Sequence, residues 1–270
     1  MTDRIDLPTF AADPCLRALV TGRTCRGEPL LRLIRTRSVL GAACLLTVTG
    51  VTGCGSSTSN PGVGSASSSG TPSVGVSGTS LRCSKPPAPA QSAPQLKLPS
   101  KKAAEGRTFT AVVQTTCGNV TFRLYGAKAP QTVASFLQLA GGYWDNSPCH
   151  RLTTQGIYVL QCGDPTGTGS GSPGYVFGIE NAPADGDYPA GTVAMARGSS
   201  PDSNGGQFFI VYKDTKLPVD SGGYSIFGKV THGMKVINAV AAAGTNSPTG
   251  DGAPAQPISI LKVTVTEKKA

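Results

Sequence analysis

The chain has 270 residues, enough for one or two domains, and a formal net charge of +9 from 24 Lys and Arg against 15 Asp and Glu. A basic chain invites a nucleic-acid-binding interpretation, but residues 107–270 hold 12 basic and 10 acidic residues, a balance of +2. The excess lies in residues 1–37 (+3) and 55–106 (+4). This distribution argues against a nucleic-acid interface and indicates a charged leader followed by a solvated basic segment.

Residues 1–53 have the pattern of a signal peptide. Three arginines within 32–37 precede an uncharged apolar run over 38–51, which is too short for a comfortable membrane span. The run ends in Val-Thr-Gly-Cys, which resembles the lipobox of bacterial lipoproteins, so Cys54 is expected to carry lipid and to begin the mature chain. Two alternatives remain open. The segment could be an ordinary secretory signal in which Cys54 is incidental, and the translation start could lie downstream of Met1.

Residues 54–106 are predicted to form a tether. Between 55 and 80, 19 of 26 residues are Gly, Ser or Thr, which cannot bury enough apolar area to offset the backbone entropy lost on folding. Residues 82–102 are rich in proline and in basic residues, which predicts a stiffer, extended segment. Periodic apolar patterning begins near Thr108, so a single domain is expected over 107–268.

Within that domain the apolar periodicity predicts mostly strands. Period-two alternation over 109–113 and 120–124, on either side of a Cys-Gly-Asn turn, indicates a hairpin. A helix is expected to begin at Pro130, and a second helix over 234–243. The other expected strands are 150–153, 157–162, 191–196, 207–212, 224–230 and 258–265. The prediction is a mainly β fold, a closed eight-stranded antiparallel β-barrel capped by two helices.

Four cysteines follow Cys54, an even number in an export-type setting, which predicts up to two disulfides. Three pairings are possible. Cys149 and Cys162 flank one expected hairpin, which favours their pairing, and Cys83 with Cys117 would then fix the tether to the first strand. A zinc site is the alternative, but the chain has no CxxC spacing and only two histidines.

Several short motifs occur in a familiar order along the domain. They are Ala-Pro-Gln-Thr-Val-Ala-Ser-Phe at 129–136, His-Arg at 150–151, Gln-Cys-Gly-Asp at 161–164, Gly-Thr-Gly at 167–169, Met-Ala at 195–196, Gln-Phe-Phe-Ile at 207–210 and Phe-Gly-Lys-Val at 227–230. Together they resemble the cyclophilins, a family of peptidyl-prolyl cis–trans isomerases, over essentially the whole of 107–268.

The resemblance implies that Arg151, Gln161 and Phe209 are catalytic. Rotation about an X–Pro bond costs amide resonance and breaks no σ bond. A fixed donor aimed at the proline nitrogen binds the twisted state better than the planar one, and the guanidinium of Arg151 can supply it. The resemblance further implies substrate-binding roles for Tyr158, Val159, Gly167, Ala196, Arg197, Gly198, Gln207, Leu217 and Tyr224. Alternation directs one of the two adjacent phenylalanines inward, and the resemblance implies that Phe209 is the one in the pocket.

The chain also departs from the family pattern. Two extra residues lie within 153–157, and one lies near 199–202. Leu217 stands about where eukaryotic members often have a tryptophan that contacts cyclosporin, so weak cyclosporin binding is expected. Tyr224 replaces a common histidine. His150 precedes Arg151 on a strand, faces the other way, and is interpreted as structural.

The predicted function is acceleration of X–Pro bond rotation in exported proteins, as a folding assistant that is anchored by lipid on Cys54 to the outer face of the cell membrane. The partners are Pro-containing polypeptides, no cofactor, metal or nucleic acid is expected, and the protein is expected to be monomeric. The alternative is a non-catalytic module that binds Pro-containing segments. A serine hydrolase is disfavoured because no serine lies in a nucleophile-elbow motif.

Overall fold

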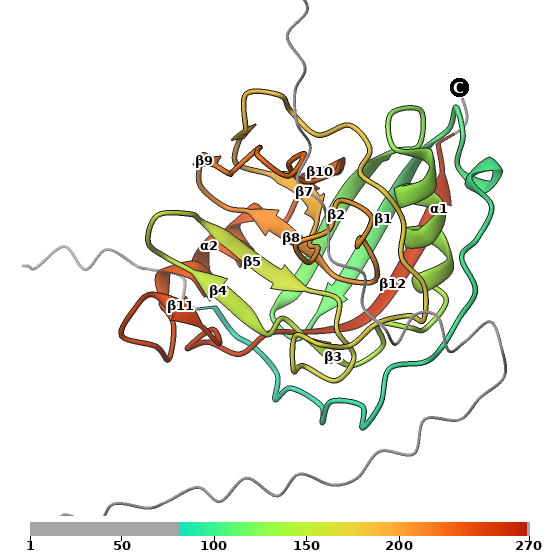
Figure 1. Cartoon of the computed structure of the whole chain (residues 1–270). Helices are drawn as coiled ribbons and strands as arrows, with labels where there is room; N and C mark the ends of the chain where they lie inside the picture. The colour runs from blue at the N-terminus through green and yellow to red at the C-terminus, as the bar shows by residue number, and fades with distance from the viewer. Residues whose placement is uncertain (1–80, 269–270) are drawn as a thin grey trace, which may run out of the picture. The chain divides into compact units, whose positions relative to one another are not determined.

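The computed structural model describes residues 81–268 (Figure 1). Neither α-helix in this part is long and apolar enough to cross a membrane. The 1–53 leader and the Cys54 lipidation site lie outside the described residues. The elements are η2 (Lys101–Ala103), β1 (Thr108–Thr115), β2 (Gly118–Tyr125), α1 (Pro130–Leu139), β3 (Ser147–Pro148), β4 (Arg151–Thr153), β5 (Val159–Cys162), β6 (Asp187–Tyr188), β7 (Thr192–Met195), β8 (Phe208–Val211), β9 (Thr215–Lys216), β10 (Ile226–His232), α2 (Met234–Ala242), β11 (Asp251–Gly252) and β12 (Ser259–Glu267).

Ten strands form one curled sheet in the order β11-β4-β5-β8-β7-β10-β2-β1-β12-β3, and every pair in it is antiparallel. β3 continues through Cys149 and His150 into β4, so the chain itself joins the two sides of the sheet. Counting β3 and β4 as one gives eight main strands, with β11 added at an edge. The expected mainly β fold with two helices is confirmed. Within the described residues the barrel is strongly curled rather than closed by strand pairing, because β11 and β3 end the strand order and are not paired with each other. The two-residue strands β3, β6, β9 and β11 carry no period and were not predicted.

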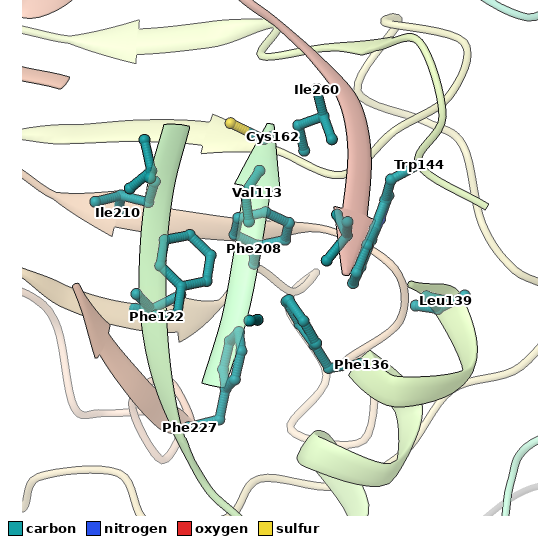
Figure 2. Close-up of a cluster of buried hydrophobic side chains, with 14 of the residues drawn as sticks. Val113, Phe122, Phe136, Leu139, Trp144, Cys162, Phe208, Ile210, Phe227 and Ile260 are labelled. Atoms are coloured by element: carbon teal, nitrogen blue, oxygen red, sulfur yellow. The ribbon is translucent and has the colours of Figure 1, made fainter. Parts of the chain in front are cut away.

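The interior of the curled sheet is filled by aromatic and aliphatic side chains (Figure 2). The ring centroid of Phe136, on α1, lies 4.7 Å from that of Trp144 and 5.6 Å from that of Phe227. Trp144 is buried, and its indole N–H donates to the carbonyl oxygens of Gly163 at 3.3 Å and Gly206 at 3.0 Å. These two glycines adjoin the end of β5 and the approach to β8. The core therefore fixes the positions of both strands.

Helix α1 begins at Pro130, as predicted, and a distant carboxylate caps it. Glu180 accepts hydrogen bonds from the backbone N–H groups of Gln131 at 3.0 Å and Thr132 at 2.8 Å. These N–H groups have no partner inside the helix, and a negative charge at a helix N-terminus is favourable. The cap ties the loop around residue 180 to the helix that closes the core.

Residues 81–106, which belong to the predicted tether, lie against the domain. In Figure 1 this teal segment passes outside α1 and below β3. Three of its backbone N–H groups donate hydrogen bonds to carbonyl oxygens of the domain. The pairs are Ser84 with Thr116 at 2.8 Å, Ala90 with Pro165 at 2.9 Å and Leu96 with Pro173 at 2.7 Å. The packed region thus begins well before Arg107. A proline-rich extended segment shows no apolar period, so its packing leaves no pattern in the sequence.

Both expected disulfides are confirmed, Cys83 with Cys117 and Cys149 with Cys162. The first fixes the start of the described segment to the β1–β2 turn. The second lies inside the barrel and joins the chain just before β4 to the end of β5. With all four sulfurs paired, none of these cysteines is left as a zinc ligand.

We predict that replacing Cys83 and Cys117 together by serine lowers the free energy of unfolding by about 2 to 4 kcal/mol, because the disulfide closes a 34-residue loop in the unfolded chain. Urea unfolding of the oxidised full chain measures it. Arg82→Ala, an exposed neighbour, is the control and should leave the free energy unchanged. Equal stability of the double variant and the parent would contradict a role for the disulfide in stability.

Candidate active site

A row of side chains crosses four neighbouring strands on the outer face of the barrel. Arg151 on β4 is paired with Gln161 on β5, Gln161 with Phe209 on β8, and Phe209 with Ala194 on β7. Residues directly opposite each other in adjacent strands point to the same face. The register therefore brings together four residues that are up to 58 positions apart in the sequence.

Alternation along the same strands separates this row from the core. Leu160 and Phe208 belong to the interior cluster, whereas Val159 and Phe209 belong to a second buried cluster on the outer face, together with Leu217. Phe208 is 1% exposed and Phe209 is 4% exposed, so both faces of β8 are covered. The expectation that Phe209 lines the pocket agrees with this placement.

The second cluster forms the wall of a small apolar slot of about 110 Å³. Phe209 lies in it, and the ring of Tyr224 stands edge-on to Phe209 with 5.7 Å between centroids. The slot is lined by Arg151, Ile157, Val159, Gln161, Ala196, Arg197, Phe209, Leu217 and Tyr224. An apolar slot of this size with a guanidinium and a carboxamide at its rim suits a small ring next to a peptide group.

The guanidinium of Arg151 is held from two sides. Its Nε and Nη2 donate to the two carboxylate oxygens of Asp251, each at 2.7 Å, and its Nη1 donates to Gln161 Oε1 at 3.3 Å. Hydrogen bonding to Arg151 lowers the pKa of the Asp251 carboxyl below its usual range, so the pair is ionised at neutral pH. The arginine is thereby presented in one orientation at the slot.

A chain of carboxamides continues from Arg151 along the rim. Gln161 Nε2 donates to Gln207 Oε1 at 2.9 Å, and Gln207 Nε2 donates to the carbonyl oxygens of Gly169 at 2.9 Å and Gly171 at 3.2 Å. These bonds fix which end of each amide carries its oxygen. The polar rim is therefore a connected network from Asp251 to the 164–171 loop.

A second hollow of about 320 Å³ adjoins the slot and shares Gln161, Ala196 and Arg197 with it. The Arg197 side chain lines both. Its guanidinium lies 4.9 Å over the Tyr224 ring and donates to Gly223 O at 2.8 Å and to Ser221 Oγ at 2.7 Å. The rest of the hollow is lined by Gly169, Gly171, Ser172, Val176, Gly198, Ser203, Gly205, Gly206 and Gln207. An extended peptide has room to occupy the slot and this hollow together.

Comparison with known proteins agrees with the fold and with the family resemblance of the sequence. The family model described as cyclophilin type peptidyl-prolyl cis-trans isomerase/CLD matches residues 110–265, more than half of the chain. The chain belongs to the cyclophilin family. It is 39% identical over 196 residues to a probable peptidyl-prolyl cis-trans isomerase B of Mycobacterium leprae, an alignment covering 67% of this chain and 65% of that protein. The chain thus spans slightly less than two thirds of this relative's length.

Two further cyclophilins are similar over nearly their whole length. A peptidyl-prolyl cis-trans isomerase-like 1 of Aspergillus fumigatus is 37% identical over 161 residues, which is 58% of this chain and 95% of that protein. The crystal structure of a cyclophilin type peptidyl-prolyl cis-trans isomerase of Cryptosporidium parvum is 30% identical, with a TM-score of 0.50, and the match covers 60% of this chain and 99% of that one. Both matches correspond to a single cyclophilin domain.

Two residues expected at the substrate site of this cyclophilin lie elsewhere. The ring of Tyr158 packs on Tyr212, with 6.0 Å between centroids, and lies under the ammonium of Lys213, while Ile157 lines the slot. Ile157 alternates in step with Val159 and Gln161, which also line the slot, whereas Tyr158 has the opposite parity. A Cβ added at Gly167 would stand 2.6 Å from Cγ of Pro148, and Gly167 lines a different hollow.

The other expected residues do gather at the slot and the adjoining hollow, including Ala196, Gly198, Leu217 and Tyr224. The charged residue of the site that the sequence did not point to is Asp251. It lies 100 positions after Arg151, in a loop rich in Gly and Pro, and belongs to none of the motifs. Asp251 is the one acidic residue between Gly244 and Pro257, but nothing in that segment indicates that it contacts Arg151.

Asp164 holds the loop that carries Gly169 and Gly171. The carboxylate is fully buried and accepts hydrogen bonds from the backbone N–H groups of Thr166 at 2.8 Å, Gly169 at 2.7 Å and Gly171 at 3.0 Å. Burial by itself raises the pKa of Asp164, but these bonds and the Thr166 hydroxyl outweigh it, so the pKa lies below its ordinary value. The charged carboxylate therefore organises the wall of the hollow.

We predict that Asp164→Asn lowers the free energy of unfolding by about 2 to 4 kcal/mol at pH 7, because an amide group then faces buried N–H donors. A lowered pKa contributes stability that is complete above about pH 4 and lost as the pH falls through the lowered pKa. Urea unfolding at pH 7 and pH 3 should therefore show the variant's deficit shrinking at the lower pH. Asp145→Asn, at an exposed position, is the control, and a deficit independent of pH would contradict the assignment.

Proposed function

We propose that this cyclophilin accelerates cis–trans rotation about X–Pro bonds in polypeptides. The proline ring fits the apolar slot on Phe209, and the residues before it extend into the adjoining hollow past Arg197. The observation that supports the proposal most directly is the fixed guanidinium of Arg151 at the rim of that slot. Family membership and the names of its relatives point to the same reaction.

The chemistry asks for stabilisation of a twisted amide rather than for a nucleophile. The barrier of about 18 to 20 kcal/mol is lost resonance, and in the twisted state the proline nitrogen regains a localised lone pair. A guanidinium N–H held at that nitrogen interacts more strongly with the twisted state than with the planar one, which is the condition for acceleration. Arg151 remains charged at any relevant pH, so the donor is always present.

We predict that Arg151→Ala lowers kcat/KM for a short X–Pro peptide by about 100-fold or more, the scale seen when one preorganised donor is removed. Arg151→Lys keeps the charge but loses the forked geometry, and should recover only part of the loss. Exchange NMR spectroscopy on the full chain with the peptide measures the rate. Arg123→Ala, an exposed arginine on β2, should match the parent.

The outcome of that assay also separates this proposal from its alternative. If the parent protein binds the peptide, as shown by shifts of slot resonances, but does not accelerate exchange, the domain is a binding module for Pro-containing segments. If it neither binds nor accelerates, the slot is not a proline site.

We propose further that the clients are exported proteins and that the protein is held at the outer face of the cell membrane by lipid on Cys54. The support is the lipobox-like sequence at 51–54 and the two disulfides of the domain, which are typical of oxidising compartments outside the cytoplasm. The domain is proposed to act as a monomer. Weak cyclosporin binding is proposed because Leu217 offers the slot a smaller wall than an indole would.

We predict that Cys54→Ser moves the protein from the membrane fraction to the soluble exported fraction and abolishes incorporation of labelled fatty acid. Expression of the full chain in a lipoprotein-processing bacterium, followed by fractionation, measures both. Cys25→Ser, in the predicted leader, is the control and should change neither. Membrane retention of the Cys54→Ser protein would show that another segment anchors it.

A further inference from the structure

We propose that Asp251 is a positioning residue of this site, which fixes the plane of the Arg151 guanidinium so that its free N–H groups face the slot. The proposal rests on the proposed prolyl isomerisation and adds a residue from a different part of the chain. Asp251 lies on β11, at the edge of the main sheet, where it is paired with Thr153 on β4. No other carboxylate in the described residues contacts Arg151 within salt-bridge distance.

The contact has the geometry that controls orientation and not only charge. A guanidinium has five N–H donors in a plane, and a carboxylate that accepts from Nε and Nη2 shares that plane. The two bonds to Asp251 are both 2.7 Å, and Gln161 accepts from Nη1 at 3.3 Å. Three donors are thus occupied, and one N–H on each terminal nitrogen remains for a substrate. Without Asp251, only the longer bond to Gln161 would orient the group.

The loop that carries Asp251 is itself held in place. Thr154 N–H donates to Gly250 O at 2.7 Å, Asn246 N–H to Ala253 O at 2.9 Å and Ala255 N–H to Gly244 O at 2.8 Å. Gly250 has φ 70°, a left-handed conformation that glycine adopts without strain, directly before Asp251. The carboxylate of Asp251 is therefore carried by a loop that hydrogen bonds hold in place. A side chain can orient another group only if its own position is fixed.

Stability does not account for the pair. The Arg151 and Asp251 side chains are 37% and 49% exposed, and ion pairs this open contribute little to folding. The carboxylate has two opposing effects on catalysis, because it orients the donor and also partly cancels its charge. Orientation dominates, since a donor that points away from the proline nitrogen contributes nothing whatever its charge, while a neighbouring carboxylate only reduces the field.

The test compares Asp251→Asn and Asp251→Ala in the full chain with the parent. We expect kcat/KM for an X–Pro peptide to fall about 10-fold in Asp251→Ala, carried mainly by kcat, and less in Asp251→Asn, which keeps one acceptor oxygen. Glu267→Gln is the matched control, because it breaks the Arg107–Glu267 pair, whose side chains are similarly exposed at 40% and 46%. It should leave the kinetics unchanged.

A double-mutant cycle separates positioning from a general effect on the fold. In an Arg151→Ala background, Asp251→Ala should produce no further loss, because the group that it orients is gone. Variants that are as fast as the parent, or faster, would overturn the proposal and leave Asp251 as a group that only damps the charge of Arg151.

A spectroscopic readout tests the positioning without turnover, so that its failure is distinguishable from failure of the proposed function. In NMR spectra of arginine-labelled protein, the Arg151 Nε–H signal should be sharp and protected from exchange with water in the parent. It should broaden or exchange rapidly in Asp251→Ala and persist in Glu267→Gln. An unchanged Arg151 signal in Asp251→Ala would overturn the proposal even if the parent protein is an active isomerase. If the parent protein shows no turnover, this NMR measurement still decides whether Asp251 orients Arg151.

Discussion

The pleat of β4, β5, β8 and β7 is the constraint on which both the core and the site depend. Each strand directs alternate side chains inward and outward, and the antiparallel register aligns the outward ones into a row. Phe208 and Leu160 fill the barrel, while Phe209 and Gln161 form the outer surface. A slip of one residue would exchange the two sets, so packing of the interior specifies the register of the site.

Much of this arrangement is predictable from the sequence, because it depends on the alternation of apolar residues along strands and on short sequence motifs. The β1–β2 hairpin, the start of α1 at Pro130 and the inward direction of one of the two adjacent phenylalanines follow from alternation or from local backbone chemistry. The gathering of Arg151, Gln161 and Gln207 followed from a family resemblance. Periodicity alone places each on a strand but does not say which strands become neighbours.

The remainder depends on contacts that have no local signature. Ile157 takes the place expected for Tyr158 because it alternates in step with Val159 and Gln161, which line the slot, whereas Tyr158 has the opposite parity and packs on Tyr212. Asp251 reaches Arg151 through a two-residue strand paired across 100 positions. Residues 81–106 are held by single hydrogen bonds, a disulfide and scattered apolar contacts, so their composition predicts an extended chain but not the surface that it lies on.

The Cys149–Cys162 disulfide has a consequence for the durability of the site. It closes a covalent ring that contains Arg151 and Gln161 together with the exposed turn at Gln155 and Gly156. Exposed turns are where proteases cut first. A single cut in this turn would leave the strand that bears the arginine and the strand that bears the glutamine covalently joined, as a nicked but undivided hairpin. The disulfide would therefore let the site tolerate a break at this exposed turn.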